Sequence, residues 1–435
     1  MASVHAIPSL DEQFEFTAES KRRLLIGGAV GVALVALGAI LLSAGVGEHA
    51  QEAIQGQGLG EGHESAHGHY KWTTRLWANV WVNSVYFTGI AVAGMFFMSY
   101  NYLAQAGWSS VIKRVPEAMP AFLPVMGTVM LGVFLIAGHD LFHWTNEGLY
   151  DKASPEYDPI IAGKRTFLNQ PFFLARMVFY FVSWYMLWRV LRNLSLQEDL
   201  YGGTEYYYKS MKYGTIFLIV FAVTSSTAAW DLIMSIDTHW FSTMFGWYTL
   251  ASWHVAGLAT MTLTTVMLKE QGYLKAVNQS HIHDLGKLVF AFSIFWTYVW
   301  FSQFMLIYYA NIPEETIYYR ERFSGHDGIY LAPFWVNVVL NFVFPFLVLM
   351  TRDAKRTSVL LKVACWGVLI GHYFDFYMDI MPGTVGKHGG FGPLEFGMIL
   401  IFACGFIWTV STQLTKANLI AKNHPLLQEA LHHDI

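Results

Sequence analysis

The chain has 435 residues, of which 54 % are hydrophobic and only 13 % are charged, and its formal net charge is −4. Soluble domains carry about 25 % charged residues, so a chain this apolar cannot cover its surface with charge in water. The composition excludes a typical cytosolic enzyme, a nucleic-acid binder and a disordered scaffold, and it indicates an integral membrane protein. The two cysteines lie inside apolar runs, and two alone cannot build a disulfide framework, an iron–sulfur cluster or a covalent haem site.

Long apolar runs follow one another along the whole chain. A membrane-spanning helix needs about 20 mostly apolar residues, and strand-type alternation is absent. We identify ten such runs, at residues 24–46, 76–103, 118–141, 168–192, 213–236, 240–268, 285–311, 330–350, 358–380 and 394–415. The sequence therefore predicts an all-α integral membrane protein with ten transmembrane helices.

The positive charges of the connections predict the orientation. Eighteen Lys and Arg residues fall on the side of the two termini and eight on the opposite side. Because positively charged connections stay in the cytoplasm, we expect segment 1–23 and tail 416–435 to be cytoplasmic. Residues 47–75 then form an outer loop rich in His and Gly. Its composition is typical of a flexible linker, with a histidine metal site as the alternative.

Spans 2–5 and 6–9 resemble two copies of one unit, covering residues 76–236 and 240–380. Three pairs of short segments match in the same order: 91–95 with 254–258, 171–173 with 333–335, and 230–234 with 374–378. Four spans per copy is an even number, so both copies cross the membrane in the same sense. We therefore expect two parallel-related four-helix bundles, with spans 24–46 and 394–415 peripheral to them. Parallel repeats also occur in transporters.

Ionisable side chains inside the spans are the candidate functional residues, because each costs roughly 2.5–3.5 kcal/mol at mid-bilayer. They concentrate in the predicted outer halves. The candidates for quinol binding or proton transfer are His139, Asp140, His143, Arg176, Asp231, Asp237, His254, His372, Asp375, Asp379 and Glu395. His283 and Asp284, at the cytoplasmic mouth of span 7, are candidates for proton entry. A His beside carboxylates in a low dielectric can exchange protons near neutral pH, as quinol chemistry requires.

Simpler roles remain open for several of these residues. His139, Asp140, Asp237 and Glu395 are close enough to the span ends to reach the interface, and His254 could make an ordinary helix–helix hydrogen bond. Asp231, Asp375, His372 and Arg176 lie deeper, so we expect each to pair or to function. A membrane haem needs two axial histidines on facing helices. A single haem between His372 and His139 or His143 stays open, but we expect no haem, iron–sulfur cluster or metal site in this chain.

Four stretches, at 228–237, 240–257, 281–287 and 301–315, carry a resemblance to a known family. With the ten spans and the doubled bundle, the chain resembles the NrfD-like, or polysulfide-reductase anchor, family of quinol-interacting membrane subunits. Within that family it is most similar to a membrane subunit of bacterial alternative complex III. The resemblance extends over residues 20–420 and rests on the combination of stretches, because none is a sharp motif.

The resemblance implies a quinol:electron-acceptor oxidoreductase in a bacterial inner membrane, with menaquinol as a possible substrate. The implied partners are a homologous NrfD-like membrane subunit, an iron–sulfur subunit, multi-haem cytochrome c subunits, membrane lipid and possible contact with a terminal oxidase, but no nucleic acid. In such complexes quinol oxidation is usually attributed to the homologous subunit. A proton-conducting role, a purely structural role and a secondary transporter therefore remain alternatives.

Overall fold

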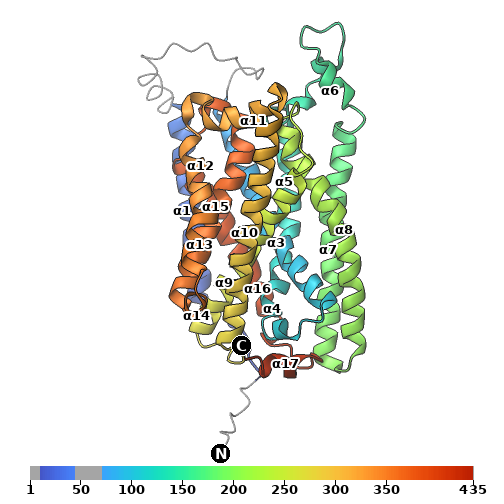
Figure 1. Cartoon of the computed structure of the whole chain (residues 1–435), viewed down its shortest axis with the longest axis vertical. Helices are drawn as coiled ribbons and strands as arrows, with labels where there is room; N and C mark the ends of the chain where they lie inside the picture. The colour runs from blue at the N-terminus through green and yellow to red at the C-terminus, as the bar shows by residue number, and fades with distance from the viewer. Residues whose placement is uncertain (1–9, 45–70, 435) are drawn as a thin grey trace, which may run out of the picture.

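The computed structural model describes residues 10–44 and 71–434 and is built from long, roughly parallel helices (Figure 1). Within these residues, eight helices are long and apolar enough to cross a membrane. The described part contains no β-strand, only an isolated bridge between Gln13 and Asn418. The prediction of an all-α, multi-pass membrane protein is confirmed at this level.

The eight candidate spans correspond to α1 (Ala18–Ser43), α3 (Trp72–Leu103), α4 (Arg114–Ala118) with α5 (Leu123–Leu141), α8 (Glu205–Leu232), α10 (Gln279–Ala310), α12 (Leu331–Val338) with α13 (Phe344–Leu349), α15 (Ser358–Val385) and α16 (Pro393–Leu414). Two other predicted spans, α7 (Gln170–Tyr201) and α9 (Phe245–Glu270), are as long but less apolar. Short helices complete the described chain: α6 (Pro159–Gly163), α11 (Pro313–Phe323), α14 (Arg352–Arg356) and α17 (Leu427–Leu431).

Several predicted boundaries change, among them the starts of the first two long helices. Helix α1 begins before the predicted span at 24, because the Thr17 side chain caps it by accepting a hydrogen bond from the Ser20 N–H. The predicted outer loop 47–75 lies mostly outside the described residues, but its last part is not a loop, since α3 begins at Trp72. Apolar periodicity marks the membrane-crossing part of a helix and misses the polar turns that extend it.

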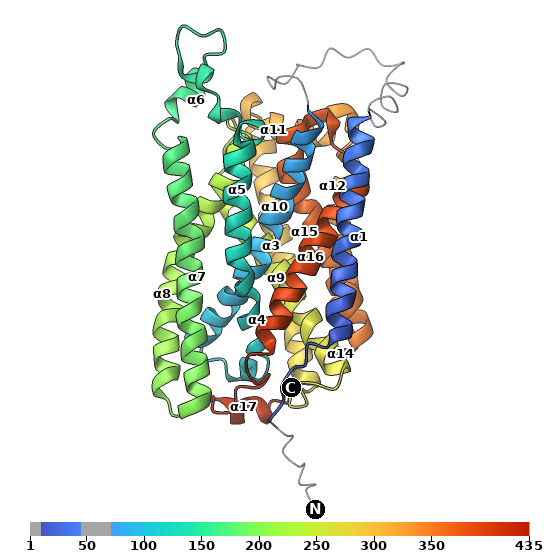
Figure 2. The same cartoon turned by 180° about the vertical axis from the view of Figure 1, so that it is seen from behind.

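The short helices mark the two ends of the molecule. Helices α6 and α11 lie at one end, which we call the α6 end, and α14 and α17 lie at the other, the α17 end (Figures 1 and 2). Helix α3 is buried near the centre and packs against α5, α8, α9, α15 and α16. Helix α1 packs along α16 and is largely exposed elsewhere, whereas α16 also packs against α3 and α4.

Small residues let α3 and α9 approach closely. A Cβ atom on Gly257 would lie 2.2 Å from the Ala93 Cβ, and one on Gly89 would lie 1.8 Å from the Trp253 ring. Such residues are the usual means of close helix packing in membranes. Segments 91–95 and 254–258, which the predicted repeat pairs with each other, therefore meet at this crossing.

The helix formed by α12 and α13 is interrupted by a π-helical turn, Val339–Val343. Pro345, at the start of α13, has no N–H and its ring crowds the carbonyl group of Asn341. The wider turn accommodates this defect, and π-turns occur frequently at functional sites. Asn337 and Asn341 are both buried on this irregular helix.

The predicted tail 416–435 is folded against the bundle wherever it is described. Helix α17 packs on the short 3₁₀ helix η1 (Gly107–Val111), and the Leu419 N–H donates to the Glu12 carbonyl oxygen over 2.8 Å. Residues 10–17 and the C-terminal segment therefore close the α17 end together. Buried Leu419, Ile420 and Leu427 anchor the segment through apolar contacts.

Candidate functional site

The strongest candidate site surrounds Asp375 on α15, whose side chain is completely buried. Four neutral groups donate hydrogen bonds to its carboxylate: the Tyr248 hydroxyl, the Ser252 hydroxyl at 2.6 Å, the Trp296 Nε1–H at 3.0 Å and the Asn337 amide at 2.9 Å. They come from α9, α10 and α12, which pack around α15 or each other. We call this group the Asp375 site. It holds a carboxylate by dipoles and without a cation among its hydrogen-bond partners.

His372 lies one helical turn before Asp375 and is also completely buried. Its Nδ1 is 3.5 Å from Asp375 Oδ2, and neither ring nitrogen makes a hydrogen bond within the described residues. The imidazole stands edge-on to the Trp296 ring, with 5.3 Å between centroids. The structure thus brings together the predicted pair His372 and Asp375, and leaves the imidazole with unused hydrogen-bonding capacity.

An apolar groove of about 440 Å³ runs between α10 and the α12 helix beside this site. Its lining is Ile294, Trp296, Thr297, Tyr298, Trp300 and Phe301 from α10, with Val338 and Phe342 opposite. Tyr298 and Phe301 are exposed on the outer surface of the bundle, whereas Trp296 is fully buried. Trp296 therefore belongs both to the groove and to the Asp375 site, and it connects the two.

Asp231 on α8 is the counterpart of Asp375 in the predicted repeat, but its surroundings differ. The Arg176 guanidinium binds it through two hydrogen bonds, of 2.7 and 2.8 Å, and the Tyr180 hydroxyl donates a third at 2.6 Å. The guanidinium also lies over the rings of Phe167 and Phe172. The charge of Asp231 is thus compensated by a positioned cation. Arg176 and Asp231, which were both predicted to lie deep within their spans, therefore form an ion pair with each other.

Further carboxylates extend from the Asp375 site toward the α6 end. Asp379, one turn along α15, accepts a hydrogen bond from the Tyr318 hydroxyl at 3.0 Å, and its Oδ2 has no partner within the described residues. Arg322 of α11 binds Asp237 at 3.0 Å and donates to the carbonyl oxygens of residues 378 and 379. Asp375, Asp379 and Asp237 form a sequence of carboxylates leading to that end.

Glu321, beside this network on α11, gives a pH-dependent prediction. Burial, and then the nearby charge of Asp237, raises its pKa from 4.5 to about 7. A carboxyl group with a raised folded-state pKa stabilises the protein when protonated, and this contribution is lost as pH rises from 4.5 through 7.

We expect Glu321→Gln to remove that loss, so the melting temperature of the variant in detergent should fall less between pH 5 and pH 8 than that of the wild type. Glu314→Gln, on the exposed part of the same helix, is the control. Identical pH profiles for wild type and Glu321→Gln would contradict the prediction.

Other predicted residues lie apart from the Asp375 site. His139 is exposed at the end of α5, where its Nδ1 is 3.0 Å from the Thr145 hydroxyl, and Asp140 and His143 are half-buried nearby. Glu395 is buried but is held by Arg75 at 2.8 Å and by the Gly392 N–H at the start of α16. These four side chains lie at or near the ends of helices, apart from the Asp375 site.

Two further predictions change in detail. His254 makes no helix–helix hydrogen bond: its ring is buried between Phe96, Tyr100 and Phe292, and neither nitrogen has a partner within the described residues. His283 and Asp284 lie at the α17 end, but the C-terminal segment covers this mouth, since His433 Nε2 lies 2.6 Å from Asp284 Oδ2.

The neutral donors around Asp375 were not predicted, because Tyr, Ser, Trp and Asn occur throughout the apolar helices of this chain. The available signal was spacing, since Tyr248 with Ser252 and Asn337 with Asn341 are four residues apart and share a helical face. Buried charges at the α17 end were not among the predicted candidates, because all of them except Arg192 lie outside the predicted spans. Buried ion pairs join Lys113 to Glu198, Arg192 to Glu117, and Arg114 to Glu117 and Asp199.

No group of three or more His, Cys, Asp or Glu side chains within residues 10–44 and 71–434 is arranged to hold a metal ion. The histidines of the predicted outer loop, including His49 and His63, lie outside the described residues. No protein-family model matches the chain, and no curated protein matches it. The chemistry of the Asp375 site is therefore the basis for a functional assignment.

Proposed function

We propose that this chain is a membrane subunit of a quinol:cytochrome c oxidoreductase complex of the alternative complex III type, in the NrfD-like family, and that it binds quinol at the Asp375 site. One observation carries the proposal: a buried carboxylate held only by neutral donors lies behind one wall of an aromatic groove that is open on the bundle surface. A groove of this size and lining suits a flat aromatic headgroup.

In the proposed reaction a quinol loses two electrons and two protons and becomes a quinone. Asp375 accepts a proton from a quinol hydroxyl, and His372, 3.5 Å away, exchanges it. Asp379 and Asp237 then pass protons toward the α6 end. The two electrons pass to an iron–sulfur partner subunit, which is reduced. None of the proposed steps uses a redox centre in this chain. Menaquinol is the proposed quinol.

We also propose the finer architecture on which this direction depends. All ten long helical segments span the membrane: α3, α5, α7 and α8 form one four-helix bundle, and α9, α10, α12–α13 and α15 form the second. Neighbouring helices within each set pack against one another, and α3 of the first set also packs against α9 and α15 of the second. Both termini are cytoplasmic, so the α6 end faces outward in a bacterial inner membrane, toward the iron–sulfur and multi-haem cytochrome c subunits. The homologous NrfD-like subunit packs alongside within the membrane.

A proton-conducting subunit, with quinol oxidised in the homologous subunit, is the second candidate. The observation in its favour is His254, a buried imidazole with both nitrogens unpartnered among the described residues. It would relay protons from His283 and Asp284 toward Asp375. A secondary transporter has less support, because such proteins unwind a helix at mid-membrane and the irregular segment at Val339–Val343 stays helical.

Photochemical labelling tests the quinol site. We expect an azido-quinone added to membranes containing the whole complex to label residues of the α10–α12 groove, with excess menaquinone abolishing the label. Trp300→Ala, which removes a groove wall without touching the Asp375 hydrogen bonds, should reduce labelling several-fold. Trp247→Ala, an exposed aromatic outside the groove, is the control. Labelling confined to another subunit would favour the proton-conducting alternative.

A further inference from the structure

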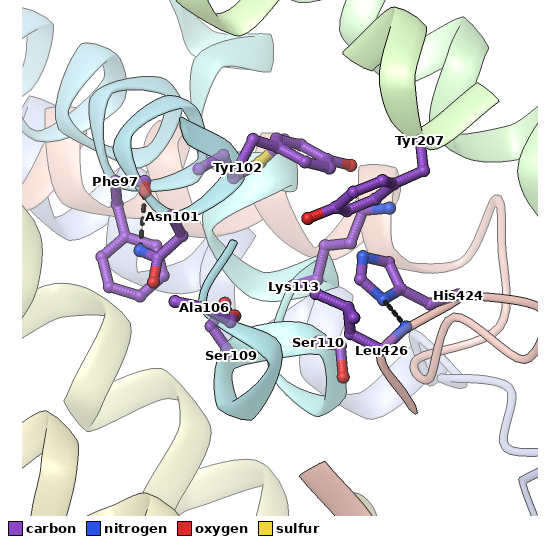
Figure 3. Close-up of a pocket in the computed structure, with 11 residues that line it drawn as sticks. Phe97, Asn101, Tyr102, Ala106, Ser109, Ser110, Lys113, Tyr207, His424 and Leu426 are labelled. Atoms are coloured by element: carbon purple, nitrogen blue, oxygen red, sulfur yellow. Dashed lines mark hydrogen bonds between the residues drawn. The ribbon is translucent and has the colours of Figure 1, made fainter. Parts of the chain in front are cut away.

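A small polar cavity lies at the α17 end, and none of its lining residues belongs to the Asp375 site. Its volume is about 20 Å³, and its walls come from α3, η1, the start of α8 and the C-terminal segment. Figure 3 shows the rings of Tyr102 and Tyr207 above Lys113 and His424, with Ser110 at the lower edge. These side chains come from three separate stretches of the sequence, around residues 97–113, 207 and 424–426.

Three buried hydroxyl groups of this cavity have no hydrogen-bond partner within the described residues. They belong to Tyr102, Ser110 and Tyr207, whose exposed fractions are 6 %, 2 % and 6 %. Leaving a buried polar group without a hydrogen-bond partner destabilises a protein. Three such groups on the wall of one cavity therefore indicate a ligand that makes hydrogen bonds with them.

The charged groups around the cavity neutralise one another. Lys113 Nζ lies 3.1 Å from Glu198 Oε2 and over the face of the Tyr102 ring. The other carboxylate oxygen, Glu198 Oε1, lies 3.9 Å from His424 Nε2 and has no hydrogen-bond partner in the described part of the chain. That separation is too long for a direct hydrogen bond. A water molecule between these two atoms can make a hydrogen bond with each of them.

The protonation of His424 is fixed by its surroundings. Burial, and then the charges of Lys113 and Arg114, lowers its pKa to about 2, so the imidazole is neutral at physiological pH. Its Nδ1 accepts a hydrogen bond from the Leu426 N–H at 3.2 Å. The ring proton therefore sits on Nε2, which faces Glu198 as a donor.

Size then decides the class of ligand. One water needs roughly 10–15 Å³ of such space, so a cavity of about 20 Å³ has room for one or two and for no organic molecule. The compensated ion pair gives no net charge that would select an ion. We propose that this cavity is a hydration site, in which water bonds the hydroxyls of Tyr102, Ser110 and Tyr207 beside the Lys113–Glu198 pair, and that the C-terminal segment is its lid.

Hydrogen bonds hold the C-terminal segment to the rest of the protein before and after the residues that line the cavity. Asn423 Nδ2 donates to the Asp199 carbonyl oxygen at 2.8 Å, and Asn278 Nδ2 donates to the His433 carbonyl oxygen at 2.6 Å. Between these fastenings, His424 and Leu426 supply one wall. The C-terminal segment thus controls whether the buried ion pair exchanges with water at the α17 end.

X-ray hydroxyl-radical labelling of the full-length protein in its complex tests the hydration site, because radicals formed from bound water modify adjacent side chains. Met98 lines the cavity and Met126 does not, although their exposed fractions are 3 % and 1 %. We expect Met98 to be oxidised several-fold faster than Met126. Equal rates in the wild type mean a dry cavity and overturn the proposal, without the need for any variant.

Two variants sharpen this test. Ala106→Leu places a larger side chain in the cavity and should reduce Met98 oxidation to the rate of Met126, whereas Leu103→Ala, on the exposed face nearby, should not. Persistent fast oxidation in a folded Ala106→Leu protein would contradict the assignment. For the lid, Asn423→Ala combined with Asn278→Ala should increase Met98 oxidation. An unchanged rate would show that the C-terminal segment does not close the site.

Discussion

Replacing Asp375 by Asn is expected to lower quinol oxidation by the assembled complex about 100-fold or more, the range for loss of a general base. The asparagine side chain has nearly the same shape and still accepts hydrogen bonds from Ser252 and Trp296, but it cannot take up a proton. Steady-state quinol:cytochrome c activity in membranes, normalised to the amount of complex recovered with its partner subunits, gives the measurement.

The matched control is Asp140→Asn, because Asp140 is a predicted candidate that the structure leaves half-buried at the end of α5. We expect its activity to stay within about twofold of the wild type, a surface substitution having little effect. Full activity in Asp375→Asn would reject Asp375 as the base. Activity retained together with a loss of proton release in vesicles would support the proton-conducting alternative.

Replacing Arg176 by Leu is expected to destabilise the protein by about 3–5 kcal/mol, the usual cost of leaving one partner of a buried ion pair unpaired. Asp231 would keep only the hydrogen bond from Tyr180 and would remain buried without its cation. The expected result is loss of most folded protein from the membrane, or a large drop in melting temperature measured by fluorescence in detergent.

The double variant Arg176→Leu with Asp231→Leu separates a structural role from a functional one. Replacing both partners of a buried pair by apolar residues is often neutral or stabilising, so we expect stability and quinol oxidation to recover largely together. If stability returns while activity does not, Asp231 takes part in the reaction and the assignment to Asp375 alone is wrong.

The contrast between Asp231 and Asp375 explains why one repeat unit is proposed to carry the chemistry. Both carboxylates occupy equivalent positions in the predicted repeat and both are buried. Arg176 compensates the first through two hydrogen bonds. Among the described residues, the second has only neutral donors and an adjacent imidazole without hydrogen bonds. A carboxylate without a cationic partner remains available to accept a proton from a substrate, which is the role proposed for Asp375.

The sequence by itself determined the helical, membrane-spanning character of the chain and the positions of its long helices. It could do so because a bilayer imposes a local requirement, about 20 apolar residues with every backbone group bonded within the helix. It also identified Asp375, His372, Asp231 and Arg176, because charge inside an apolar run is conspicuous in any single span. Several predicted boundaries were wrong, for example at Ala18 and Trp72, where polar turns extend the helices.

Only the tertiary structure decided which of these residues share a site. Asp375 meets Tyr248 and Trp296 through the packing of α15, α9 and α10, and Asp231 is neutralised because α7 brings Arg176 across to α8. The Lys113–Glu198 pair and its lid likewise join segments that are 85 or more residues apart. Helix periodicity is a property of neighbouring residues, whereas the cost of a buried charge depends on what other helices place around it, and that is settled only when the helices pack.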